Sequence, residues 1–137
     1  MGGILEMSMK KKTNQKKKQG SVREVDARYA VRKRVSMNDI QAIANRIAEG
    51  FAVDKIILFG SYAHGMPREG SDVDLCVVMS APGRTFARTL DIIHYLCPLR
   101  FGIDIVVRTE DDFTRRIPQG DFFLQEILEK GKVLYVR

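Results

Sequence analysis

The sequence predicts a small α/β domain in which helices pack on a mixed β-sheet. Short apolar or alternating runs, typical of strands, are interleaved with stretches in which apolar residues recur at helical spacing. The chain has 137 residues, 45% of them hydrophobic, which suits one domain with its own core. The expected order of elements is α-β-α-β-α-β-α-α-β, which favours a layered architecture.

The ordered domain is expected over residues 36–137, after a basic tail over residues 1–35. The net charge of the whole chain is +6, and the tail alone carries +8 against −2 for the remainder. The segment Lys10–Ser21 lacks apolar residues and is expected to be disordered. Residues 22–35 carry only a thin apolar stripe, so a helix and an irregular segment are both open there.

Composition excludes several classes of protein. The sequence has no run of about 18 apolar residues, so no membrane span is predicted. No apolar region follows the early lysines, so no secretory signal is predicted either. A cytoplasmic location is therefore expected, with Cys76 and Cys97 as buried, reduced thiols. With only His64 and His94 beside them, and no ligand spacing, a zinc site is not favoured.

The first elements are expected before residue 80. Ser36 with Asp39 resembles a capping box, and apolar residues follow at helical spacing: Ile40, Ile43, Ile47 and Phe51. Residues 55–59 are a β-branched apolar run, read as a buried strand, and a helix is expected after Ser61. Residues 72–79 alternate as a second strand, with one face made of Val73, Leu75, Val77 and Met79.

The remaining elements follow the same logic. A helix ending before Pro98 is predicted from an apolar stripe of Phe86, Leu90, Ile93 and Cys97. Residues 103–107 alternate as a third strand, and Thr109 with Asp112 caps a helix to about Ile117. Asp121 begins a last helix, which Gly131 closes as a left-handed cap before a strand over 133–136. Four aromatic residues are read as core, Tyr62, Tyr95, Phe122 and Phe123, although an exposed part of the last three could form a partner surface.

Polar residues at the strand ends carry the chemistry. Gly60-Ser61 follows the first strand directly, and Asp72 and Asp74 project from one face of the second. Asp104 interrupts the apolar third strand. Ionised carboxylates facing a core would be costly, so three of them near strand ends suggest a bound cation. Two Mg²⁺ ions held this way could clamp the attacking and leaving oxygens of a phosphoryl or nucleotidyl transfer.

The spacing of these residues resembles a known signature. Gly60-Ser61, ten intervening residues and then Asp72-Val73-Asp74 resemble the motif of the DNA polymerase β nucleotidyltransferase superfamily. The stretch LFGSYAHGMPREGSDVDLCVV and the ending FFLQEILEKGKVLY are similar to its minimal nucleotidyltransferase (MNT) branch, and Asp104 in FGIDIVV matches the third carboxylate. The resemblance covers residues 36–137 and implies a polymerase-β-like nucleotidyltransferase fold.

The resemblance also implies roles for these residues. Gly60 and Ser61 would hold the nucleotide triphosphate, and Asp72 and Asp74 would bind two Mg²⁺ ions. Asp104 would bind the catalytic ion and help deprotonate the acceptor hydroxyl. Members of the branch are often antitoxins of HEPN-type toxin ribonucleases, and the better-understood ones transfer AMP from ATP to a tyrosine of the toxin.

Three nearby residues keep two interpretations each. Ser71 is either a nucleotide contact or a turn residue. Arg68 is either a phosphate partner or a solvated loop residue. His64 stands where many relatives carry Arg, and solvent exposure is favoured over a ligand contact there.

The leading hypothesis for function is an Mg²⁺-dependent transfer of AMP from ATP to a partner protein of the HEPN toxin type. A small-molecule substrate such as an antibiotic is the weaker enzymatic alternative, because relatives of that kind carry a helical domain after the catalytic one and this sequence ends at Arg137. A binding-only antitoxin is the non-enzymatic alternative. Nucleic-acid binding rests on the lysine-rich tail alone and is expected to be weak.

Overall fold

The computed structural model describes residues 7–8, 11–12, 34–81 and 84–137. Its contacts divide the chain into two units, Met1–Lys33 and Arg34–Arg137. In the first unit, two short strands pair antiparallel, β1 (Met7–Ser8) and β2 (Lys11–Lys12). The rest of the predicted tail up to residue 33 lies outside the described residues. The question whether residues 22–35 form a helix therefore falls almost entirely on residues that are not described.

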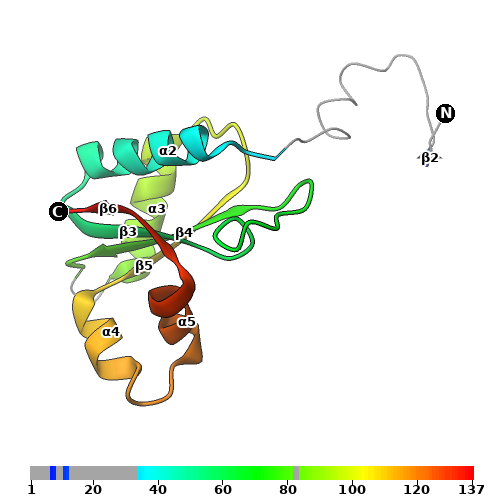
Figure 1. Ribbon diagram of the computed structural model, residues 1–137. Helices are drawn as coiled ribbons and strands as arrows, with labels where there is room; N and C mark the ends of the chain where they lie inside the picture. Colours follow the sequence, from blue (N-terminus) through cyan, green and yellow to red (C-terminus); the bar gives the residue numbers. More distant parts are fainter. Residues whose placement is uncertain (1–6, 9–10, 13–33, 82–83) are drawn as a thin grey trace. The chain divides into compact units, whose positions relative to one another are not determined.

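A four-stranded sheet in the order β5-β4-β3-β6 organises the second unit (Figure 1). Its strands are β3 (Val53–Phe59), β4 (Val73–Met79), β5 (Ile103–Arg108) and β6 (Lys132–Val136). β4 runs parallel to β5 and antiparallel to β3, and β3 runs antiparallel to β6. The predicted mixed sheet is confirmed, although β3 begins two residues earlier than expected.

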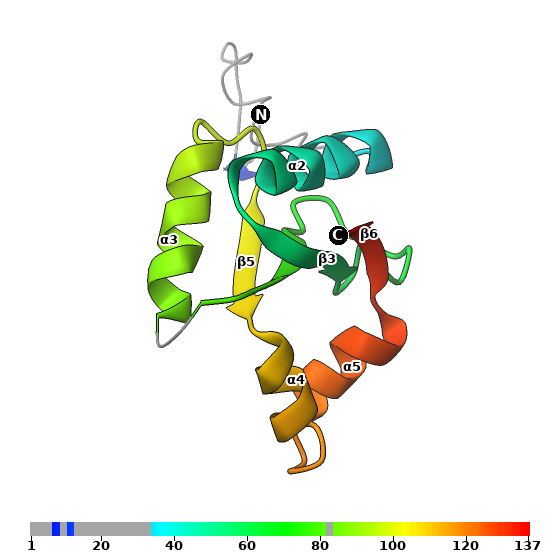
Figure 2. The same cartoon turned by 90° about the vertical axis from the view of Figure 1, so that its left-hand side faces the viewer.

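Helices cover both faces of this sheet. α2 (Met37–Gly50) and α3 (Thr85–Leu96) share one core cluster with the strands. α4 (Glu110–Arg116) and α5 (Phe122–Lys130) share a smaller cluster with the opposite face. Figures 1 and 2 show α2 on one side of the sheet and α4 with α5 on the other. No described helix is both long and apolar enough to cross a membrane.

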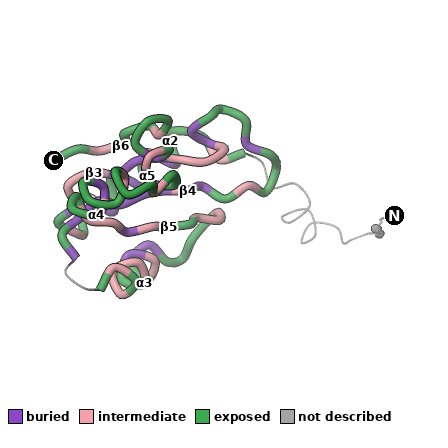
Figure 3. Tube along the Cα trace, turned by 90° about the horizontal axis from the view of Figure 1, so that it is seen from below, coloured by how far each residue is buried: buried purple, intermediate pink, exposed green. Residues whose placement is uncertain are grey.

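The alternation of β4 decides which residues enter which cluster. The predicted set Val73, Leu75, Val77 and Met79 packs in the larger cluster, beneath α2 and α3. Cys76 and Val78 face the other way and pack with Phe113, Leu124 and Ile127 of α4 and α5. Figure 3 shows buried residues gathered along the strands, with the outer surfaces of the helices exposed. The side chains of Asp72 and Asp74 project to the same face of the sheet as the smaller cluster.

Side-chain caps begin three helices where the sequence predicts them. Ser36 Oγ accepts a hydrogen bond from the Asp39 amide at 3.1 Å. Thr109 and Asp112 form a full capping box, with bonds of 3.0 and 2.9 Å. Asp121 accepts from the amide three residues later at 3.0 Å. These bonds satisfy amides that the first helical turn leaves without partners.

The apolar stripe predicted for α3 is wrong at three of its four positions, because of the four only Ile93 packs against the core. Phe86 is 73% exposed, Leu90 is 41% exposed, and Cys97 is exposed as well. The residues buried from this helix are Ile92 and Leu96. The helix carries two overlapping stripes at helical spacing, and the sheet packs against the one rotated toward Ile92. Cys97 is therefore not the buried thiol expected, whereas Cys76 is.

The helix predicted after Ser61 is replaced by turns over residues 61–65. The His64 amide donates to the Gly60 carbonyl at 3.2 Å, a single helical turn, and the Met66 amide donates to the Ser61 carbonyl at 3.1 Å. Gly65 then adopts a φ of +76°, which no continuing right-handed helix allows.

Two predictions about Gly131 and about three aromatic residues are also wrong. Gly131 has a φ of −74° and is not a left-handed cap. It is required for space, because a Cβ there would meet the Ile127 carbonyl oxygen and Ile57 Cγ2 at 2.5 Å each. Three aromatic residues read as core are exposed instead, Phe122 by 79%, Phe123 by 46% and Tyr95 by 41%. Tyr62 is buried as expected.

Candidate active site

Asp74 occupies the centre of the candidate site. It is the second residue of β4, a half-buried position, and the register of the sheet places it between two neighbours. On one side it pairs with Phe59, the last residue of β3, and on the other with Asp104 of β5. Paired residues on adjacent strands lie about 5 Å apart and project to the same face. The two aspartates that the sequence placed on separate strands are thus direct neighbours.

Gly60 closes the site against Asp74. Its φ of +75° is a left-handed conformation that glycine adopts without strain. A Cβ at this position would collide with Asp74 Oδ2 and would lie 3.2 Å from Asp74 Cγ. The backbone of the Gly60-Ser61 turn therefore approaches the carboxylate more closely than any other residue would permit.

The electrostatics of the site are unfavourable without a cation. Burial raises the pKa of Asp74 above its ordinary value of 3.8, and the negative charges of Asp104 and then Asp72 raise it further. Asp72 and Asp104 are themselves exposed. A bound cation would relieve this repulsion, and three carboxylates are the hard oxygen donors that Mg²⁺ prefers.

The three aspartates fit a metal by their chemistry and by the face they share. Within residues 34–81 and 84–137, however, no three His, Cys, Asp or Glu side chains are already gathered closely enough to hold a metal ion. The exposed carboxylates of Asp72 and Asp104 would have to turn toward Asp74 to complete such a set. The three aspartates are therefore candidate metal ligands that are not yet arranged to coordinate an ion.

The loop between Ser61 and Asp72 does not bring every predicted residue into the site. Arg68 is exposed, and its amide donates to Ser71 Oγ at 3.0 Å while its carbonyl accepts from the Ser71 amide at 3.0 Å. The Ser71 hydroxyl thus shapes a turn. His64 is exposed as expected, and its Nε2 lies 3.9 Å from a carboxylate oxygen of Glu126.

A pocket of about 160 Å³ opens beside Gly60, on the side of α5. Its walls include Phe59 and Phe123, whose rings meet edge to face at a centroid distance of 5.6 Å. Glu126 and Lys130 stand on the same face of α5 and complete it. Glu126 and Lys130 were not predicted to lie at the site, although their spacing from Phe123 by three and seven places was a usable signal.

Comparisons with known proteins agree with this geometry. Residues 41–137 match the family model described as polymerase beta, nucleotidyltransferase. A protein of Methanocaldococcus jannaschii that carries the provisional name protein adenylyltransferase is 38% identical over 85 residues, or 61% of this chain and 79% of the relative.

Two crystal structures share the fold. A protein of Sulfolobus solfataricus provisionally named a nucleotidyltransferase matches with a TM-score of 0.54 and 17% identity, over 82% of this chain and 86% of the other. A mutant of the toxin–antitoxin MntA–HpeT matches with a TM-score of 0.50 and 19% identity, over 75% of each chain. The family match over residues 41–137 and the close relative together show that the chain belongs to the polymerase β nucleotidyltransferase family and is a nucleotidyltransferase.

Proposed function

We propose that this nucleotidyltransferase transfers AMP from ATP to a hydroxyl group of a partner protein. The observation that carries the proposal is the placement of Asp74, directly beside Asp104 on the next strand and against the Cβ-free face of Gly60. A protein acceptor is supported by the relative with 38% identity, whose name describes a protein adenylyltransferase.

Gly60 and Ser61 would bind the triphosphate. The missing side chain of Gly60 leaves room for phosphate oxygens next to Asp74, and the turn amides with the Ser61 hydroxyl are the donors nearest to that space. Asp72, Asp74 and Asp104 would hold two Mg²⁺ ions, whose positive charge would offset the charge that develops on the phosphate oxygens. Arg68 is exposed outside the site and would have to move toward it to act as a second triphosphate contact, with Ser71 shaping its loop.

The transfer exchanges one phosphorus–oxygen bond for another. The acceptor oxygen attacks the α-phosphorus of ATP, the bond from this phosphorus to the oxygen bridging the β-phosphate breaks, and pyrophosphate leaves. The proton of the acceptor hydroxyl passes to the Asp104 carboxylate. Because Asp104 is exposed on an edge strand, it can return that proton to water after the transfer.

The partner proposed is a HEPN-type toxin that AMP transfer silences. The shared fold with the MntA–HpeT toxin–antitoxin supports a toxin as partner. We place the reaction in the cytoplasm, where ATP is available. The free thiols of Cys76 and Cys97 suit a reducing compartment.

The test supplies the full chain, Mg²⁺ and the product of the adjacent gene with ATP labelled on either the α- or the γ-phosphate. Label from the α-phosphate alone should appear on the partner. Asp74→Asn should reduce transfer at least about 100-fold, since changes even behind a metal ligand cost about 10–100-fold. Asp91→Asn is the matched control, because its carboxylate forms a surface ion pair with Arg88 at 2.8 Å, outside the site.

Three results would count against the proposal. Transfer of the γ-label would indicate a kinase. Neutralisation of the toxin by Asp74→Asn without any label would indicate an antitoxin that acts by binding. Label on an added small molecule but never on the partner would indicate the small-molecule alternative.

A further inference from the structure

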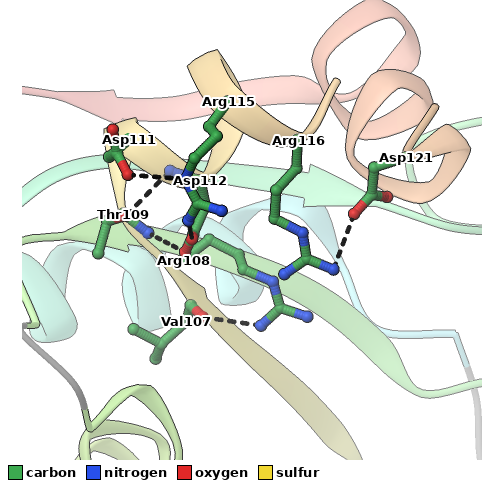
Figure 4. A network of polar contacts seen from close by, with 8 residues as sticks. All are labelled: Val107, Arg108, Thr109, Asp111, Asp112, Arg115, Arg116 and Asp121. Atoms are coloured by element: carbon green, nitrogen blue, oxygen red, sulfur yellow. Dashed lines mark hydrogen bonds and ion pairs between the residues drawn. The ribbon is translucent and has the colours of Figure 1, made fainter. Parts of the chain in front are cut away.

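A second polar pocket lies at the other end of β5 from Asp104. It has a volume of about 520 Å³, and its lining includes Arg108, Thr109, Asp111, Asp112, Arg115 and Arg116. Figure 4 shows Arg108 extending from the end of β5 toward the region that Arg115 and Arg116 reach from α4. Three arginines against two aspartates leave the lining of this Arg108 pocket with one net positive charge.

Arg108 has unused hydrogen-bonding capacity in this pocket. Its Nη1 donates to the Val107 carbonyl at 2.8 Å, while its Nε is buried without any partner. Within residues 34–81 and 84–137 no carboxylate pairs with it. One other described guanidinium has a buried Nε without a partner, that of Arg88, but Arg88 does not line this pocket. A buried donor without a partner is destabilising, so a turn of the Arg108 guanidinium toward an acceptor that enters the pocket would be favoured.

Arg108 stands opposite Val78 of β4, a buried member of the smaller core cluster. Burial raises the pKa of the Cys76 thiol to about 12, and the positive charge of Arg108 opposes that effect. A charge held near low-dielectric surroundings binds a counter-ion more strongly than one in open water.

The other two arginines are held in place by their own partners. Arg115 binds Asp111 at 3.2 Å and Asp112 at 3.3 Å, and Arg116 binds Asp121 at 3.0 Å. These ion pairs, drawn in Figure 4, restrain both guanidinium groups. Arg108 therefore offers free donors next to two guanidinium groups that are already positioned.

We propose that the Arg108 pocket is an oxyanion site that takes a phosphate group, free or as the ester of a larger molecule. A carboxylate has two oxygens, which one guanidinium satisfies, whereas a phosphate has further oxygens that can bridge Arg108 to a second arginine. The pocket is larger than a free phosphate needs, so an ester also fits.

This pocket is separate from the nucleotidyl-transfer site. Asp104 and Arg108 stand four residues apart on the same face of β5, about 13 Å at the usual rise of a strand. The inference goes beyond the proposed function and does not depend on it.

The experiment titrates the full ¹⁵N-labelled chain with inorganic phosphate at constant ionic strength and follows amide shifts. The amides of Arg108, Thr109 and Arg116 should shift saturably. Arg108→Gln should raise the dissociation constant at least about tenfold, because charge-assisted hydrogen bonds are lost. Arg108→Lys, which keeps the charge but not the fork, should give an intermediate constant. Arg100→Gln, an exposed arginine elsewhere, is the matched control and should bind as the native chain does.

A second arm repeats the titration with glycerol phosphate, which binds at the same amides if the site takes phosphate esters. Equal binding by Arg108→Gln and Arg100→Gln, in variants whose spectra show a native fold, would overturn the inference, as would shifts that never saturate. Asp74→Asn separates the two proposals. It should lose label transfer and keep phosphate binding at Arg108, whereas a failure of phosphate binding with transfer intact overturns the pocket alone.

Discussion

The close approach of Gly60 to Asp74 can be isolated by comparing two glycines with nearly the same backbone. Gly60 and Gly65 have φ values of +75° and +76°. A Cβ on Gly60 would collide with the Asp74 carboxylate, whereas a Cβ on Gly65 would meet nothing within 4 Å. Gly65→Ala should therefore cost only the left-handed backbone, about 1–2 kcal/mol of unfolding free energy.

Gly60→Ala should cost the same backbone term and also displace the carboxylate. Forcing Asp74 off its rotamer adds about 0.5–1.5 kcal/mol to the backbone cost of about 1–2 kcal/mol, so the total is about 1.5–3.5 kcal/mol. Urea unfolding followed by circular dichroism measures both variants. AMP transfer should fall about 100-fold in Gly60→Ala, because an ångström of misplacement is enough for such a loss, and only slightly in Gly65→Ala. Equal effects of the two substitutions on stability and on transfer would show that the contact between Gly60 and Asp74 does not matter.

Three further predictions follow from burial. Leu124→Ala should lower the free energy of unfolding by about 2–5 kcal/mol, because Leu124 is fully buried, while Leu128→Ala, at a position 54% exposed, should change it by less than about 0.5 kcal/mol. Similar losses of unfolding free energy for the two variants, measured by urea unfolding, would contradict the assigned buried face of α5. Burial, and then its acidic neighbours, raise the pKa of Asp74, so its protonation stabilises the folded state at low pH and this contribution is lost as the pH rises through the raised pKa. Asp74→Asn should therefore be more stable than the native chain in thermal melts at pH 7 without Mg²⁺. A less stable variant would count against repulsion among the three carboxylates. Iodoacetamide should modify exposed Cys97 in the folded protein but reach Cys76 only after unfolding, because burial raises the pKa of Cys76 to about 12; mass spectrometry showing native modification of Cys76 would contradict its burial.

Local signals predicted most of the framework. The caps at Ser36 and Thr109 depend on residues three apart, so they are readable from a short window. The alternation in β4 is equally local. It assigned Val73 and Cys76 to opposite faces, as the two core clusters confirm.

Long-range packing decided what the sequence did not. Periodicity along α3 could not choose between the stripe of Phe86 and the stripe of Ile92, because only contact with the sheet distinguishes them. Gly131 was expected to have a positive φ, yet its reason is the closeness of Ile57, 74 positions earlier in the chain. A glycine in the sequence does not by itself show whether it is there for a positive φ or because no Cβ would fit.

The candidate site divides in the same way. Asp74 and Asp104 were predicted on two different strands from motif and pattern, and the register shows that these strands are neighbours and that the two aspartates pair. The pocket wall of Phe123, Glu126 and Lys130 was not predicted, because it depends on how α5 lies beside the end of β3. The Arg108 pocket was missed for a related reason, since it joins the end of a strand to the helix that follows.

The central claim is that Asp72, Asp74 and Asp104 with the Gly60 turn form one site for a divalent cation and a nucleotide. Substoichiometric Mn²⁺ added to the full ¹⁵N-labelled chain with a non-hydrolysable ATP analogue tests it most directly, because the ion broadens the amide signals nearest to it. We expect the broadening to centre on Gly60, Asp74 and Asp104 and to disappear from these residues in Asp74→Asn. Broadening centred on Asp111 and Asp112 instead, or unchanged by Asp74→Asn, would contradict it.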